Sequence, residues 1–166
     1  MIYTIKKGKH KSKPRQLGYW MGRNKFRWKI LFTPSCRYNL QSVDQLDVNK
    51  LVGIGYLPGH HKHSARFGWC YNPTTDLIEL SAYCYINGKR IIKRITECAV
   101  DKEYKIELFI NEWCYFLSCS AADSSGLNYE VKIEHKHRKE FQYRLGTFFG
   151  GNRVAPHEIK IKIDRA

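Results

Sequence analysis

The chain has 166 residues, of which 43% are hydrophobic, and this length fits one globular domain with a sizeable core. No stretch approaches the roughly 18–20 consecutive apolar residues of a transmembrane helix, which excludes a membrane span. The formal net charge of +14 favours acidic partners, because a basic surface attracts phosphates, acidic polymers and acidic protein faces.

The basic charge is concentrated near the N-terminus. Eleven lysines and arginines precede the first acidic residue, Asp44, and the remainder of the chain is nearly balanced. We therefore expect a basic N-terminal arm over residues 1–25 and a folded domain over residues 26–166. The arm is expected to bind an acidic protein surface, assembly subunits or nucleic acid; the alternative is a solubilising tail. The residues that would carry this binding are Lys6, Lys7, Lys9, Lys11, Lys13 and Arg15.

The N-terminal residues contain no apolar core of a secretory signal, so we expect synthesis in the cytoplasm without a signal peptide. The six cysteines include no C-x-x-C pair, and in that compartment buried, reduced thiols are expected rather than disulfides. The sequence places His60, His61, His63 and Cys70 near one another, but no companion motif supplies the four converging ligands of a zinc site. We expect no metal and no cofactor.

Strand patterns dominate from Phe26 onward. Apolar and polar residues alternate over residues 104–110, 129–135 and 157–163, which is typical of strands with one buried face. A short helix is expected around residues 42–51. Many short strands with few helical signals predict an all-β fold, namely an antiparallel β-sandwich or jelly roll, with a barrel as the alternative.

The clearest local signal is a hairpin in which Asn87-Gly88 joins the strands 77–86 and 89–96. A type I′ turn needs positive φ at both central residues, and Asn-Gly tolerates this best. The turn predicts that residues whose numbers add up to 175 face each other, so that Leu80 faces Ile95. One face of the hairpin is then apolar. The other carries Tyr83 and Tyr85 beside arginines, which suits sugar rings, although tyrosine is also simply a favourable strand residue.

Two segments carry a resemblance to a known fold family. They are residues 60–69, with the sequence HHKHSARFGW, and residues 148–159, with the sequence FFGGNRVAPHEI. Together they resemble the concanavalin A-like (lectin/glucanase) jelly-roll sandwiches of bacterial and phage proteins, over roughly residues 26–164. The resemblance implies a sheet that receives glycans, for which the face carrying Tyr83 and Tyr85 is the candidate. It does not fix an activity, because such folds host many functions.

The combined prediction is a non-catalytic, lectin-like binding or assembly module. Together with the expected absence of a signal peptide, the resemblance favours a phage virion structural or decoration protein, whose basic arm anchors on an acidic partner while the sandwich is displayed outward. We expect no catalytic residue. The residues expected to bind a glycan are Glu79, Tyr83, Tyr85, Arg90, Arg94 and Arg66.

Catalysis on an acidic glycan is an alternative. A set formed by Tyr83, Tyr85, Arg66, Arg90 and His61 could supply the base, the acid and the charge neutralisation of a polysaccharide lyase, but the sequence signatures of alginate-lyase-like members are absent. A glycoside hydrolase needs two carboxylates about 5–9 Å apart, and the chain lacks the alternating acids of the glucanase pattern.

Nucleic-acid binding is a further alternative. Aromatic and basic residues are interleaved over residues 19–28, and such residues can stack on unpaired bases and neutralise phosphates. The same alternation is also that of an ordinary first strand, and no RNA- or DNA-binding signature is present.

Overall fold

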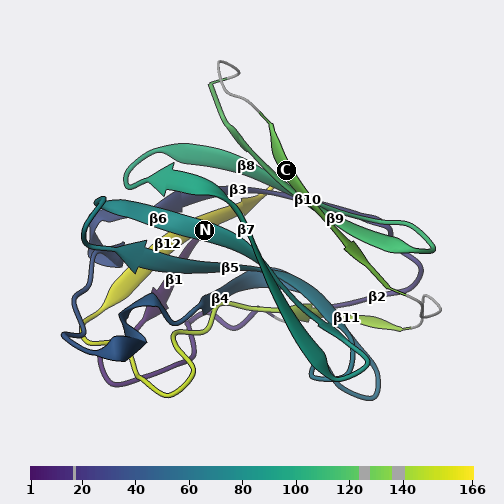
Figure 1. The fold of residues 1–166 in the computed structure, drawn as a ribbon, viewed down its shortest axis with the longest axis horizontal. Coiled ribbons are helices and arrows are strands. Elements are labelled where there is room, and N and C mark those ends of the chain that lie inside the picture. Colours follow the sequence, from purple (N-terminus) through teal and green to yellow (C-terminus); the bar gives the residue numbers. More distant parts are fainter. Residues whose placement is uncertain (17, 124–127, 136–140) are drawn as a thin grey trace.

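The computed structural model describes residues 1–16, 18–123, 128–135 and 141–166. Within these residues, twelve strands form two antiparallel sheets that pack face to face (Figure 1). The sheets pack face to face because their strands have one apolar face. In strand β3 (Lys25–Phe32), for example, Phe26, Trp28, Ile30 and Phe32 are buried while the residues between them face outward. The structure confirms the predicted all-β fold, an antiparallel β-sandwich.

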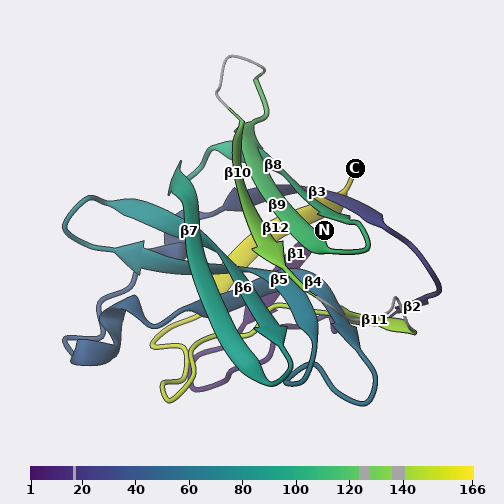
Figure 2. The same cartoon turned by 45° about the vertical axis from the view of Figure 1, so that its right-hand side comes forward.

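In the described part of the chain, each sheet has six strands. Sheet A has the order β1 (Ile2–Ile5), β12 (Ile159–Arg165), β3, β8 (Glu103–Ile110), β9 (Cys114–Ala121) and β10 (Tyr129–Glu134). Sheet B has the order β2 (Tyr19–Trp20), β11 (Gln142–Leu145), β4 (Asn49–Tyr56), β5 (Ser64–Asn72), β6 (Leu77–Ile86) and β7 (Lys89–Ala99). The edge strands β7 and β10 lie next to each other (Figure 2). There the Lys93 amine donates a hydrogen bond of 3.2 Å to the Lys132 carbonyl.

Aromatic side chains from both sheets form the core. The ring of Trp69 on β5 lies 5.4 Å from that of Phe32 on β3, centroid to centroid, and the Trp28 and Phe67 rings are 6.3 Å apart. Phe149 packs edge-on against Trp69 as well. Burying each such side chain contributes roughly 1.5–3 kcal/mol, so this cluster holds the two layers together.

The predicted hairpin is present as β6 and β7. Asn87 and Gly88 both have positive φ, at 51° and 80°, as the type I′ turn requires. The predicted register holds from the turn to Ser81, which faces Arg94, but a bulge follows and Leu80 faces Thr96. The expected pairing of Leu80 with Ile95 is therefore wrong, because β7 contains one additional residue there and Ile95 is buried in the core.

The helix expected around residues 42–51 is also wrong for most of its length. A 3₁₀ helix covers Val43–Leu46, where the Ser42 hydroxyl accepts a hydrogen bond from the Asp44 amide, and β4 begins at Asn49. Alternation of valine, leucine and isoleucine with two glycines favours strand over helix here. A second 3₁₀ helix covers Pro34–Cys36. No helix in the described part of the chain combines the length and the apolar character needed to cross a membrane.

Residues 1–25, expected as a basic arm, run along the sandwich. Strand β1 pairs with β12 in sheet A. The chain then turns back, so that Thr4 and Lys13 exchange two backbone hydrogen bonds of 2.8 Å, and Lys11 forms a bridge with Phe148 beside sheet B. The segment thereby joins the edges of both sheets. The six cysteines, all within the described residues, are unpaired and buried.

Candidate functional site

The candidate site lies on the outer face of sheet B. Arg66 on β5 and Tyr83 on β6 are cross-strand partners, and each alternates with a core residue, Phe67 and Ala82 respectively. Because successive strand residues point to opposite faces, Arg66 and Tyr83 project away from the other layer. Tyr83 is 6% exposed, and the Lys50 amine and the Tyr85 ring pack against its ring.

Two glycines of β4 make room for the site. A Cβ atom on Gly53 would lie 2.3 Å from the Arg66 Cβ, and one on Gly55 would lie 2.8 Å from the Tyr143 ring and 2.9 Å from the His60 Cβ. No real Cβ atom approaches its neighbours so closely, so only glycine lets the side chains of β5, β11 and the β4–β5 loop lie across β4.

The first of two adjoining pockets, which we call the tyrosine pocket, has a volume of about 270 Å³. Hydroxyl-bearing, cationic and aromatic groups line it together with two glycines. The lining residues are Lys50, His60, His61, Ser64, Arg66, Tyr83, Tyr85, Phe148, Gly150 and Gly151.

Ring contacts fix the side chains of the tyrosine pocket. The His61 ring stacks on Tyr85 with 5.2 Å between centroids, and Tyr83 meets Tyr85 edge-on at 5.9 Å. The Lys50 amine lies 5.1 Å above the Tyr83 ring and donates a hydrogen bond of 2.8 Å to the Gly150 carbonyl. The aromatic rings are therefore held in place, and one face of Tyr85 is covered.

The neighbours of Tyr83 favour its ionised form. Burial alone would raise the pKa of Tyr83, but a hydrogen bond with Tyr85 and the nearby charges of Lys50 and Arg90 outweigh it, so the pKa is lowered. In return, the hydrogen bond with Tyr83 raises the pKa of Arg90. Burial lowers the pKa of Lys50. The tyrosine pocket thus pairs an acidified phenol with cations.

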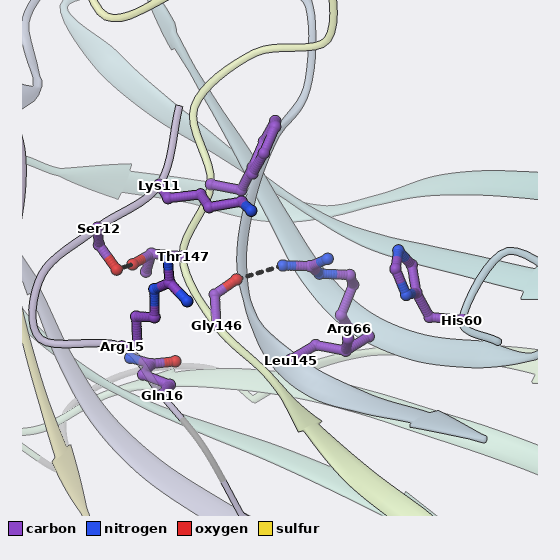
Figure 3. Close-up of a pocket in the computed structure, with 10 residues that line it drawn as sticks. Lys11, Ser12, Arg15, Gln16, His60, Arg66, Leu145, Gly146 and Thr147 are labelled. Atoms are coloured by element: carbon purple, nitrogen blue, oxygen red, sulfur yellow. Dashed lines mark hydrogen bonds between the residues drawn. The ribbon is translucent and has the colours of Figure 1, made fainter. Parts of the chain in front are cut away.

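The second pocket, which we call the arginine pocket, has a volume of about 310 Å³ and shares His60, Arg66 and Phe148 with the first. Figure 3 shows Arg15 on one side of Gly146, and Arg66 and His60 on the other. The residues that complete the lining come from the N-terminal segment and from the chain after β11. They are Lys11, Ser12, Arg15, Gln16, Leu145, Gly146 and Thr147.

Arg66 is a buried cation. Its side chain donates a hydrogen bond to the Gly146 carbonyl (Figure 3), while among the described residues its Nε has no hydrogen-bond partner. Burial lowers the pKa of Arg66 to about 10, against the opposing influence of Tyr83 and Tyr143. Burying a charge without a counter-charge is costly, so the position of Arg66 opposes the stability of the fold.

Neither pocket has an aspartate or glutamate among its described lining residues. His60, between the two, has its pKa lowered by burial and by the charges of His61 and Arg66. Its Nδ1 lies 3.2 Å from the Tyr143 hydroxyl. The electrostatic character of both pockets is accordingly cationic.

The structure brings together three of the six residues predicted to bind a glycan, because Arg66, Tyr83 and Tyr85 line one pocket. Arg90 lies beside them, opposite Tyr85 on the neighbouring strand β7. The other two lie on the same face but do not line the pocket, and both are engaged elsewhere. Glu79 accepts a hydrogen bond of 3.0 Å from the Asn72 amide, and Arg94 forms an ion pair of 2.6 Å with Glu97.

The six basic residues predicted as an anion-binding arm all have exposed side chains. Within the part of the chain that the structure describes, none of them forms an ion pair. Lys11 and Arg15 line the arginine pocket. A third pocket, of about 370 Å³, adjoins it and is lined by Lys6, Lys9 and Lys13 as well.

Sequence reasoning missed several residues of the site. Lys50 and Gln16 stand in no motif, and only the close approach of distant segments brings them to the pockets. Phe148 was within the segment 148–159 that carries the resemblance, but its position follows from its bridges to Lys11 and Lys50, which only the fold shows.

Comparison with known proteins bears on the fold. No family model and no curated protein matches the chain. Among solved structures, the chain is similar to a functionally unknown protein from Saccharomyces cerevisiae, with a TM-score of 0.57 and 7% identity over 90% of this chain and 73% of that one.

Weaker likenesses concern other β-sandwich proteins. The SPRY domain of human HERC1 gives a TM-score of 0.45 at 16% identity, covering 99% of this chain and 87% of that one. The comparison with chicken Galectin 2 gives a TM-score of 0.41 at 11% identity, covering 98% of each chain. At such identities the comparisons concern the fold alone, and the character of the site rests on its own residues.

Proposed function

We propose that this chain is a non-catalytic, lectin-like sandwich of the concanavalin A-like type, which binds a carbohydrate in the tyrosine pocket. The observation that carries the proposal is the convergence of Tyr83, Tyr85 and Ser64 with Lys50 and Arg66 in one pocket of about 270 Å³ on the outer face of a sheet. Hydroxyl and N–H groups next to aromatic carbon suit a ligand that is itself both hydroxylated and apolar.

The ring contacts define how a sugar would be held. His61 covers one face of Tyr85, and the Lys50 amine lies over Tyr83. Broad stacking of a sugar on an open ring face is therefore not the main contact. A sugar ring in this pocket would be held by hydrogen bonds to the tyrosine hydroxyls and the basic groups, with aromatic edges as its walls.

Two further parts of the functional hypothesis stay predictions. Display on a phage virion rests on the resemblance alone. Anchoring of the basic segment on an acidic protein surface rests on its six exposed basic side chains. A segment tied by backbone hydrogen bonds to both sheets would present those side chains as part of the domain surface.

A glycan array that contains neutral and acidic glycans tests the proposal. We expect binding by the unaltered chain and its loss in Tyr85→Ala, because this change removes both a hydroxyl group and the ring on which His61 packs. Tyr83→Phe keeps the buried ring and removes only the hydroxyl, so it separates hydrogen bonding from packing.

The matched control is Tyr129→Ala, which removes a 44% exposed tyrosine from β10 in the other sheet. This variant should bind like the unaltered chain. If no glycan on the array binds, or if all three variants lose binding alike, the lectin proposal is rejected.

One observation favours a second candidate, a polysaccharide lyase acting on an acidic glycan. Tyr83, with its lowered pKa, lies in one pocket with Arg66 and His61. A tyrosinate is a competent base, and cations stabilise the charge that develops when a proton next to a carboxylate is removed.

The lyase candidate has a direct assay. Elimination leaves an unsaturated uronate, which absorbs in the ultraviolet, so the chain is incubated with a panel of acidic polysaccharides and the absorbance is followed. A rise that disappears in Tyr83→Phe would support catalysis. A flat trace with every polysaccharide removes this candidate and leaves the binding proposal.

A further inference from the structure

The arginine pocket contains buried polar groups that the fold itself does not satisfy. Arg66 is 7% exposed and Gln16 is 5% exposed. Among the described residues, the Arg66 Nε and both polar atoms of the Gln16 amide have no hydrogen-bond partner. Leaving such a buried group unsatisfied costs roughly 1–3 kcal/mol. A ligand in the pocket would supply the missing partners.

The charge of the lining specifies the kind of ligand. Lys11 and Arg15 join Arg66 at the pocket, and no acidic residue is present among the described residues that line it. Since unlike charges attract, a negatively charged group is favoured here. A neutral or cationic group would leave the Arg66 charge without compensation.

The geometry of the guanidinium group indicates which kind of anion fits the arginine pocket. One arm of the Arg66 guanidinium is fixed by its bond to the Gly146 carbonyl, and the Nε–H remains as a donor. Arginine presents its donors in a rigid fork that matches the oxygens of carboxylates, sulfates and phosphates. The Gln16 side chain packs against Gly146, and its amide nitrogen, which has no hydrogen-bond partner among the described residues, is a further donor in the lining of the pocket.

The two pockets adjoin. They share His60, Arg66 and Phe148, so one ligand can extend from the tyrosine pocket into the arginine pocket. We propose that the arginine pocket binds an oxyanion, the carboxylate or sulfate of an acidic glycan, through Arg66, Lys11, Arg15 and Gln16. The oxyanion site stands on its own residues, and only the assignment of the anion to a glycan rests on the function proposed above.

Nuclear magnetic resonance titration tests the oxyanion site, because Arg Nε–H and Gln side-chain amide signals are both observable. The probes are sodium sulfate and sodium glucuronate, with sodium chloride at equal ionic strength and glucose as controls. We expect saturable shifts of the Arg66 Nε–H, the Gln16 side-chain amide and the Gly146 backbone amide with sulfate and glucuronate, and none with chloride or glucose.

Variants at the rim avoid disturbing the buried arginine. The double change Lys11→Ser with Arg15→Ala removes two exposed cations, and we expect the affinity for sulfate to fall about tenfold or more. The control is Lys7→Ser, which removes an exposed lysine of the same segment that does not line this pocket. It should leave the affinity unchanged.

The outcomes separate this inference from the proposed function. A response of Arg66 to sulfate but not to glucuronate supports the oxyanion site and makes sulfate the favoured group. The same response together with a glycan array that shows no binding keeps the oxyanion site and removes the glycan as its source. Glycan binding without any shift at Arg66 or Gln16, or equal responses to chloride and sulfate, overturns the inference while the lectin proposal stands.

Discussion

The guanidinium of Arg66, on β5, donates a hydrogen bond to the backbone carbonyl of Gly146, which follows β11 and lies 80 residues further along the chain. This contact ties the chain after β11 to the outer face of sheet B, at a residue that lines both of the pockets described above. It also leaves a buried positive charge with no carboxylate in the described lining. A group so placed favours ligand binding at the expense of stability.

Replacement of Arg66 by methionine tests that trade-off. Methionine fills a similar space without a charge, so the penalty for burying the guanidinium disappears. We expect the free energy of unfolding to stay the same or to rise, while the affinity for sulfate is lost. Urea denaturation and sulfate titration measure the two effects. A loss of more than about 2 kcal/mol in stability would show that the arginine is mainly a structural residue.

Gly55→Ala is expected to destabilise the fold and to disturb the site. The added Cβ would lie 2.8 Å from the Tyr143 ring and 2.9 Å from the His60 Cβ, so these side chains must move. Overpacking of this kind costs about 1–3 kcal/mol. Thermal unfolding measures this loss. Gly59→Ala, where an added Cβ meets no atom within 4 Å, is the control and should change the melting temperature little.

Local sequence patterns predicted the fold well, because strands and turns carry short-range signals. Asn87-Gly88 specified its turn and the first part of the β6–β7 register, since both depend on backbone conformation at two residues. The bulge that brings Ile95 into the core carries no such signal, because it depends on packing between sheets. The prediction of a helix over residues 42–51 is wrong because a short run of mixed residues suits helix and strand almost equally. The segment contains a 3₁₀ helix and the start of β4 instead.

The site was only partly predictable for the same reason. Tyr83 and Tyr85 followed from alternation along one strand, and the pairing with Arg90 followed from the turn. Lys50 and Gln16 come from segments whose approach depends on sheet topology, which periodicity does not reveal. Glu79 was on the predicted face, yet its bond to Asn72 engages it away from the pocket.

Tyr83 should ionise at lower pH than an ordinary tyrosine. Its pKa is lowered because the hydrogen bond with Tyr85 and the charges of Lys50 and Arg90 outweigh the opposing effect of burial. The folded state then binds fewer protons than the unfolded state between that pKa and about 10, so stability rises with pH over this window. Ultraviolet titration of tyrosinate should show an early step that is absent in Tyr83→Phe. If the titration curve of Tyr83→Phe has the same early step as that of the unaltered chain, the step does not belong to Tyr83.

The cysteines of the native protein should resist thiol reagents. Burial raises the pKa of Cys70 and of Cys84 to about 12, and a hydrogen bond with Cys119 together with burial raises that of Cys98. Since the thiolate is the reactive form, a disulfide-exchange reagent at pH 8 should modify these thiols only slowly. In denaturant all six cysteines should react. Fast modification of Cys84 in the native state would show that β6 opens readily.

If the outer face of sheet B recognises an acidic glycan through the two adjoining pockets, the charge of the ligand must contribute to its affinity. The most direct measurement is the calorimetric affinity of the tightest-binding glycan from the array, compared with its carboxyl methyl ester or desulfated form. Either change removes the negative charge that Arg66 is proposed to meet and leaves the rest of the glycan unaltered. We predict that the charged form binds at least about tenfold tighter, or about 1.4 kcal/mol. A neutral glycan as the tightest ligand, or equal affinity for both forms, would contradict the recognition of an acidic group by Arg66.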